Sequence, residues 1–144
     1  MTDWADNPRL TTWLAAQQAA FPAWSERTGQ DWDFSIDSLD RLERLLRQRF
    51  AGWDEVRAAE EAEDPAVTVP AWYLGEVQNR HCGTAWHRNP VAPVHPDQPG
   101  TPFVQRPGDD EDEVPLSNPF TEIRGLFVRG PGERLRDVVT RYLA

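Results

Sequence analysis

The chain has 144 residues and a net charge of −9, because 24 acidic residues outnumber 15 basic ones. That length suits one domain, and the negative charge argues against binding to nucleic-acid backbones or anionic membranes. All 15 basic residues are arginine, which excludes Schiff-base chemistry, a lysine general base and the lysine of phosphate-binding loops.

The first predicted element is a helix over residues 9–20. Asn7 and Pro8 start it, since asparagine is a good N-cap and proline suits the first helical position. Phe21 and Pro22 interrupt it, because proline lacks the amide donor that a helix interior needs.

Residues 36–50 carry the clearest helical periodicity of the chain, with Ser35 as the expected N-cap. One stripe at 100° per residue is apolar and consists of Ile36, Leu39, Leu42, Leu46 and Phe50. On the opposite face each acid precedes an arginine by four residues, in the pairs Asp37 with Arg41, Asp40 with Arg44, and Glu43 with Arg47. We expect this helix to pack against the core and these pairs to account for its arginines.

Two further helices are expected before the strands. Residues 54–63 are acidic and rich in alanine, which favours a surface helix or a linker. The next helix begins near Pro70 and stops at Gly83, since glycine suits the left-handed position after a helix. Glu76 turns away from the apolar face of this helix, toward a pocket or toward water. That apolar face consists of Tyr73, Leu74, Val77 and His81.

Three short strands are predicted over residues 84–87, 102–105 and 114–116. The prolines between them remove amide donors, so the sheet should be small and antiparallel. Two C-terminal helices follow, over residues 119–128 and 133–143. The first of them repeats the asparagine-proline start of the N-terminal helix.

These elements predict an α+β fold, with about five helices packed against a small antiparallel sheet of three or so short strands. Residues 1–144 form a single domain in this interpretation. Its parts are an N-terminal helical segment (1–34), a helical core (35–82), short strands with proline-rich loops (83–117) and C-terminal helices (118–144).

The only cysteine and two of the three histidines lie within residues 72–90. A Cys82 thiolate with His81 or His87 as its base would suit a small hydrolase or transferase, with Glu76 in the same site. The simpler interpretation is a buried structural cysteine, because free cysteine is among the most buried residue types. We predict no metal and no cofactor, since zinc-site spacing is absent from the set His81, Cys82, His87 and His95.

Motifs of serine hydrolases, nucleotide-binding proteins and metalloproteases are absent, which favours a non-catalytic protein without deciding the point. The N-terminus lacks the basic and apolar regions of a signal peptide, so the cytoplasm is the expected compartment. No apolar run approaches the roughly 20 residues that span a bilayer, and no membrane association is expected.

Seven tryptophans are too many for one small core, and exposed tryptophan is enriched at interface hot spots. Trp4 and Trp32 lie among acids and should be the accessible ones. We therefore predict an immunity-like or accessory protein-binding module, for which a basic protein partner fits best. Its candidate binding residues are Trp4, Trp32, Glu76, Asp109, Asp110, Glu111, Asp112 and Glu113. The small hydrolase or transferase around Glu76 and Cys82 stays open as the alternative.

Three motifs give the chain a resemblance to known domains: D-S-L-D-x-L at residues 37–42, W-Y-L-G-E-V at 72–77 and G-x-x-W-H at 83–87. Their order over residues 35–107 resembles small uncharacterised actinobacterial domains. The resemblance implies a helix with Tyr73, Leu74 and Gly75, followed by a strand with Trp86. It extends to Asn118, Pro119, Phe120 and Tyr142, and it implies no activity and no catalytic residue.

Overall fold

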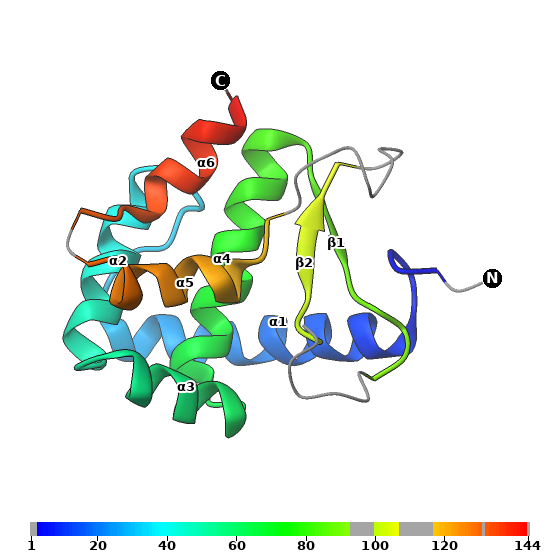
Figure 1. The fold of residues 1–144 in the computed structure, drawn as a ribbon, viewed down its shortest axis with the longest axis horizontal. Coiled ribbons are helices and arrows are strands. Elements are labelled where there is room, and N and C mark those ends of the chain that lie inside the picture. The colour runs from blue at the N-terminus through cyan, green and yellow to red at the C-terminus, as the bar shows by residue number, and fades with distance from the viewer. Residues whose placement is uncertain (1–2, 93–99, 107–116, 131, 144) are drawn as a thin grey trace.

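The computed structural model describes residues 3–92, 100–106, 117–130 and 132–143 (Figure 1). These residues form six helices and two strands. In chain order they are α1 (Pro8–Thr28), α2 (Ser38–Arg49), α3 (Trp53–Glu61), α4 (Pro65–Cys82), β1 (Ala85–His87), β2 (Phe103–Gln105), α5 (Pro119–Val128) and α6 (Leu135–Leu143). The fold is α+β and mostly helical, as predicted in outline. No helix in this part of the chain is long and apolar enough to cross a membrane.

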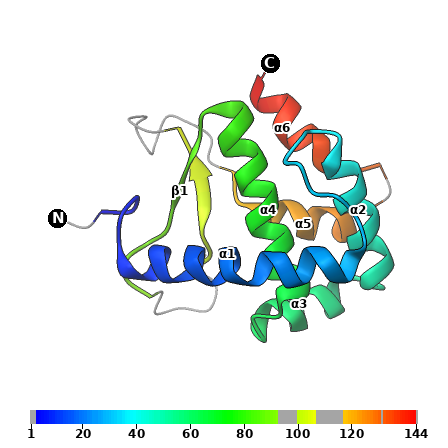
Figure 2. The ribbon, with the colours of Figure 1, turned by 180° about the vertical axis from the view of Figure 1, so that it is seen from behind.

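Helix α4 lies at the centre of the molecule and contacts every other helix and strand. Helix α1 crosses it on one side (Figure 2), while α2, α5 and α6 gather at one end and the two strands lie at the other (Figure 1). Residues 67–75 of α4 are all buried. A helix that is apolar on all sides is what a central core position requires.

The predicted start of this helix near Pro70 is wrong, because α4 begins at Pro65 and runs through Pro70. Asp64 caps it with a carboxylate oxygen that accepts from the amide of Ala66 at 2.9 Å. Burial of the surrounding side chains offsets the hydrogen bond that Pro70 removes. Gly83 ends the helix in the left-handed conformation, with φ of 71°, as predicted.

The predicted interruption of α1 is also wrong, since the helix continues through Pro22 to Thr28. Pro22 itself is exposed, but Trp24 is buried and the Phe21 ring lies 5.2 Å from the ring of Trp72 on α4. These aromatic contacts hold the last two turns of α1 against the core, which local propensity rules do not capture.

The arginine pairs predicted within α2 form only in part. Glu43 and Arg47 lie 3.5 Å apart, as expected. Asp40 instead binds Arg136 at 2.8 Å, and Asp37 binds the same guanidinium at 3.0 Å. These acids therefore join α2 to α6, two helices that are far apart in sequence.

The sheet has two antiparallel strands in the described residues, with Trp86 of β1 opposite Val104 of β2. Ser117 adds an isolated bridge to Val104, and the strand predicted over residues 114–116 lies outside the described part. Helix α5 has the predicted bounds because Asn118 caps it, accepting from the amides of Phe120 and Thr121.

Candidate functional site

Glu76 is held in place by the indole of Trp86. Its carboxylate accepts a hydrogen bond of 2.8 Å from Nε1 of Trp86, so the side chain points to strand β1. The preceding residue, Gly75, lies directly under the same ring, and a Cβ there would be 2.2 Å from it. Glu76 therefore positions the strand, a role that helical phasing alone did not reveal.

Cys82 is buried, with 8% of its surface exposed, as the structural interpretation predicted. Its thiol donates to the carbonyl oxygen of Val139 at 3.7 Å. Burial raises the pKa of this thiol, which disfavours the thiolate that a nucleophile needs. In this setting Cys82 joins the end of α4 to α6.

The two described histidines make separate local contacts. His81 is exposed, which corrects its predicted place on the apolar face of α4, and its Nε2 lies 3.0 Å from the carbonyl oxygen of Phe34. In the last turn of α4 it is Cys82, and not His81, that faces the core. His87 stacks on Phe103 with ring centroids 5.6 Å apart.

No hydrogen bond or ion pair in the described part of the chain joins Cys82 to His81, His87 or Glu76. The structure therefore does not bring these candidates together into a nucleophile and its base. Within the same residues no three His, Cys, Asp or Glu side chains are placed to hold a metal ion, and His95 lies outside them.

Trp4 and Trp32, the candidate binding tryptophans, are each half-buried. Trp4 packs edge-on against Phe103 with centroids 6.0 Å apart. Trp32 lies 4.9 Å from Trp24 and donates from Nε1 to the Thr28 hydroxyl at 2.9 Å. Both therefore have neighbours within the fold. The acidic run at residues 109–113 lies outside the described residues.

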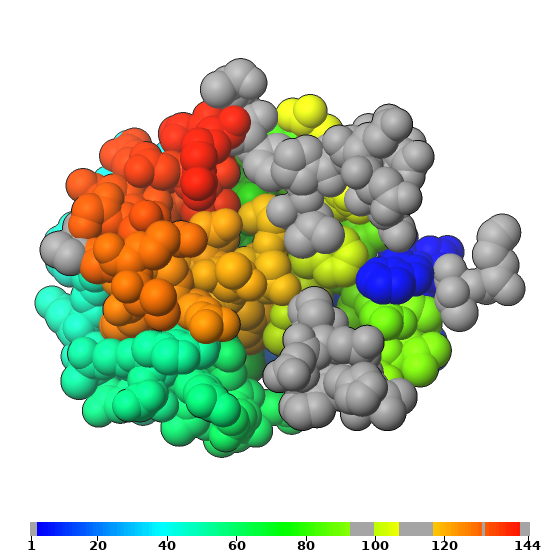
Figure 3. Space-filling view, viewed as in Figure 1, coloured from blue at the N-terminus to red at the C-terminus, as the bar shows by residue number. Residues whose placement is uncertain are grey.

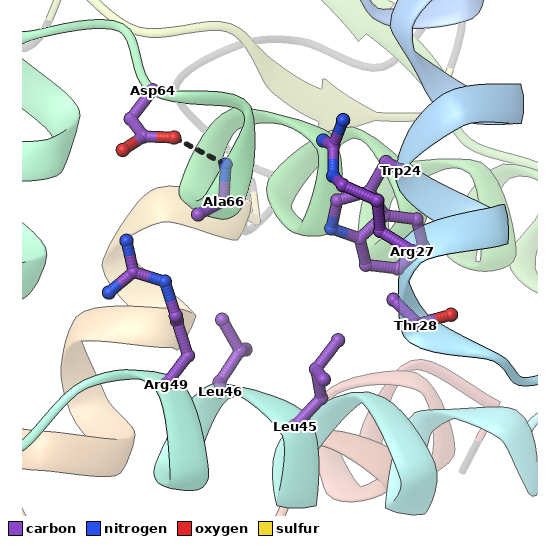
Figure 4. A pocket seen from close by; sticks show the side chains of 8 residues that line it. All are labelled: Trp24, Arg27, Thr28, Leu45, Leu46, Arg49, Asp64 and Ala66. Atoms are coloured by element: carbon purple, nitrogen blue, oxygen red, sulfur yellow. Dashed lines mark hydrogen bonds between the residues drawn. The ribbon is translucent and has the colours of Figure 1, made fainter.

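A first pocket, which we call the Trp24 pocket, opens between the end of α1, α2 and the start of α4 (Figure 4). Its volume is about 400 Å³. Arg27 lies beside the indole of Trp24 and Arg49 on the other side, with Leu45 and Leu46 below. Both arginines are exposed. The lining residues are Trp24, Arg27, Thr28, Leu45, Leu46, Arg49, Asp64 and Ala66.

A second pocket, the Arg88 pocket, has a volume of about 560 Å³ and lies between α1, the α3–α4 connection and the segment after β1. Burial lowers the pKa of Arg88, and the neighbouring charge of Arg9 lowers it further. No sequence signal points to this pocket, because Arg9 and Arg88 are far apart in the chain. Its lining residues are Pro8, Arg9, Thr12, Trp13, Ala16, Gln17, Glu63, Thr68 and Arg88.

Comparison of the chain with protein-family models, with curated proteins and with solved structures gives no match. The resemblance to actinobacterial domains therefore stays a prediction. The function is therefore inferred from the pockets and from the distribution of surface charge.

Proposed function

We propose that this chain is a non-catalytic protein-binding module of the cytoplasm, which holds a basic partner as an immunity-like or accessory protein would. The observation that supports this proposal is the net negative charge of the exposed surface of α3. Three exposed acids, Asp54, Glu55 and Glu61, accompany a single arginine, Arg57, which pairs with Glu61 at 3.4 Å. We call these three acids the acidic α3 face.

The acidic α3 face differs from the acidic face of α2, where Arg134, just before α6, and Arg136, in its first turn, neutralise the charge. Asp40 binds both Arg134 and Arg136, at 3.3 and 2.8 Å. On α3 the acids Asp54 and Glu61 are seven residues apart, so they project from the same side of the helix. The helix runs along one edge of the molecule, where its surface is open (Figure 3).

A basic partner is the chemistry that this surface suits. Opposite charges speed association and select among partners, while the buried contacts that give affinity come from elsewhere in the interface. The separate structural roles of Glu76 and Cys82 favour the non-catalytic alternative over a hydrolase or transferase. A cytoplasmic setting fits a chain whose one cysteine carries a buried free thiol.

The test compares two variants that each remove two negative charges. Asp54→Asn with Glu61→Gln alters the acidic α3 face, and Glu26→Gln with Asp31→Asn alters exposed acids at the end of α1 and in the connection that follows it. Tagged protein is used to capture partners from native lysate at low salt, with identification by mass spectrometry. We expect one basic protein to be recovered by the wild type and the second variant but not by the first.

Salt dependence supplies the second readout. The captured protein should be released as the ionic strength approaches about 1 M, where the screening length is only about 3 Å. Equal recovery by both variants, or recovery that salt does not weaken, would show that the acidic α3 face is not the binding surface.

A further inference from the structure

The Arg88 pocket contains two arginines and one acid, Glu63, whose charge acts on Arg88 without forming an ion pair. Nη1 of Arg9 donates to the carbonyl oxygens of Asn89 and Val91. Nε of Arg88 donates to Gly100 O at 2.9 Å, and its Nη1 to Arg9 O at 3.1 Å. Main-chain acceptors thus hold both guanidinium groups in place. Neither group forms an ion pair within the part of the chain that the structure describes.

Several donors of these two arginines remain unused. Nε and Nη2 of Arg9 and Nη2 of Arg88 have no acceptor among the described residues. Arginine presents its donors in a planar fork that matches the two oxygens of a carboxylate. A pair of fixed guanidinium groups with free donors is therefore a preorganised anion site rather than two solvated surface charges.

Two buried polar side chains line the same pocket. Gln17 is 7% exposed and Thr68 is 5% exposed, and neither side chain has a hydrogen-bond partner in the described ranges. The inaccessible side-chain polar atoms without a partner in these ranges belong to Arg41, Glu60, Trp72 and Gln78. The polar atoms of Gln17 and Thr68 are not among them, so they are accessible. The amide of Gln17 and the hydroxyl of Thr68 are therefore open to the pocket. A ligand in the pocket can therefore replace solvent as the hydrogen-bond partner of both groups.

The balance of charge indicates what that molecule carries. Arg9 and Arg88 contribute two positive charges and Glu63 one negative charge, so the lining is positive by one. A singly charged anion would neutralise it, and would relieve the repulsion between the two arginines. The ring of Trp13 and the Ala16 methyl add an apolar wall. The volume of about 560 Å³ falls in the usual range for small-molecule sites.

We propose that the Arg88 pocket binds a small organic carboxylate. The carboxylate accepts from Arg9 and Arg88, the rest of the ligand packs beside Trp13, and its polar atoms bond to Gln17 and Thr68. The Trp24 pocket does not share these features, because Arg27 and Arg49 are exposed and Asp64 already caps α4. This inference is independent of the proposed protein-binding function, since none of its residues belongs to the acidic α3 face.

The test uses the full chain labelled with ¹⁵N and three probes, namely benzoate, its neutral counterpart benzamide, and inorganic phosphate. We expect benzoate to shift the Nε–H signal of Arg88 and the side-chain amide signals of Gln17, in a saturable manner. Benzamide should leave these signals unchanged. Equal shifts with benzamide would overturn the proposal, and so would shifts with phosphate but not with benzoate, or shifts confined to the Trp24 pocket.

Substitutions in the Arg88 pocket measure how much its charged and its neutral side chains each contribute to the affinity for benzoate. Arg9→Gln should raise the Kd for benzoate about tenfold, and Thr68→Val, which keeps the side-chain shape, about threefold. Arg27→Gln in the Trp24 pocket is the matched control and should leave the Kd unchanged. Because Arg9 also supports main-chain carbonyls, the spectrum of each variant is compared with the wild type. If Arg9→Gln unfolds the chain, the site is tested with Thr68→Val and Gln17→Met instead. A Kd for benzoate equal to that of the wild type in both variants would refute the site.

Discussion

The carboxylate of Glu76 accepts a hydrogen bond of 2.8 Å from the indole Nε1 of Trp86, and this bond ties the middle of α4 to strand β1. Trp86 is only 7% exposed, so its donor has little access to water. The contact places the strand against the central helix at the point where Gly75 leaves room for the ring. Glu76 is thus a structural residue at the joint of helix and sheet.

Removing the Glu76 carboxylate should therefore destabilise the fold. Glu76→Ala removes the charged acceptor of this bond, which costs about 1.5 to 3 kcal/mol. The indole keeps only the longer contact to Oδ1 of Asn79, which lies 3.3 Å away when the Asn79 amide is turned to donate to Thr84. Glu76→Gln retains an acceptor oxygen and should lose less than about 1 kcal/mol. Urea unfolding measured by fluorescence gives both values, and near-UV circular dichroism reports the setting of the indole. Equal losses in the two variants would contradict this role.

Two buried glycines in helices should respond to alanine in opposite ways. In Gly75→Ala the new Cβ would lie 2.2 Å from the Trp86 ring, which is fixed by its neighbours. Such overpacking costs about 1 to 3 kcal/mol. In Gly125→Ala the new Cβ meets the end of the exposed Arg129 side chain, which can move aside. Helix propensity then favours alanine by about 0.5 to 1 kcal/mol. Thermal unfolding of the two variants distinguishes them, and similar shifts in Tm would contradict the packing argument.

The sequence predicts elements well where their ends are set by local chemistry. Helix α5 needs only the side chain of Asn118 for its N-cap, and Gly83 supplies the left-handed residue after α4. Prediction fails at Pro22 and Pro70, where burial of aromatic and aliphatic neighbours outweighs the lost hydrogen bond. That balance depends on which helices pack together, which no local pattern contains.

Contacts between distant segments are the part that the sequence does not predict. The spacing on α2 indicates an internal pair for Asp40, yet Asp40 pairs with Arg134 and Arg136 at the start of α6, because the two helices pack together. The Arg88 pocket has the same origin, since Arg9 and Arg88 meet only after the strand segment folds back over α1. Candidates chosen by proximity in sequence, such as Cys82 and His81, instead point to different neighbours.

The hydroxyl of Tyr73 forms a buried network whose loss should be measurable. Tyr73 is fully buried, and its oxygen accepts from the amide of Phe34 at 2.8 Å and lies 2.7 Å from the Ser38 hydroxyl. Tyr73→Phe leaves both partners without this bond, which costs about 1 to 3 kcal/mol. Ser38→Ala and the double variant complete a thermodynamic cycle in urea. We expect a coupling of at least about 0.5 kcal/mol, and additive losses would contradict the network.

Glu60 should make stability depend on pH in an unusual direction for an acid. Burial raises its pKa from an ordinary value of 4.5 to about 7, although the nearby guanidinium of Arg124 lowers it. One of its carboxylate oxygens is sealed and has no hydrogen-bond partner in the described residues. Between pH 4.5 and 7 the folded state therefore binds more protons than the unfolded state at this residue. Its contribution to stability must fall as the pH rises through that window and stay constant above it.

Glu60→Gln removes this titration, so the variant should gain stability over the wild type as the pH rises. Near pH 4.5 we expect the variant and the wild type to have similar free energies of unfolding. Near pH 8 the free energy of unfolding of the variant should be higher by about 1 to 2 kcal/mol, after allowance for partial access to solvent. Glu61→Gln is the control, because Glu61 is exposed and pairs with the exposed Arg57. The free energy of unfolding is measured at both pH values for each variant. If it depended on pH in the same way in Glu60→Gln and Glu61→Gln, the raised pKa of Glu60 would be contradicted, since only a buried carboxylate makes the two variants differ.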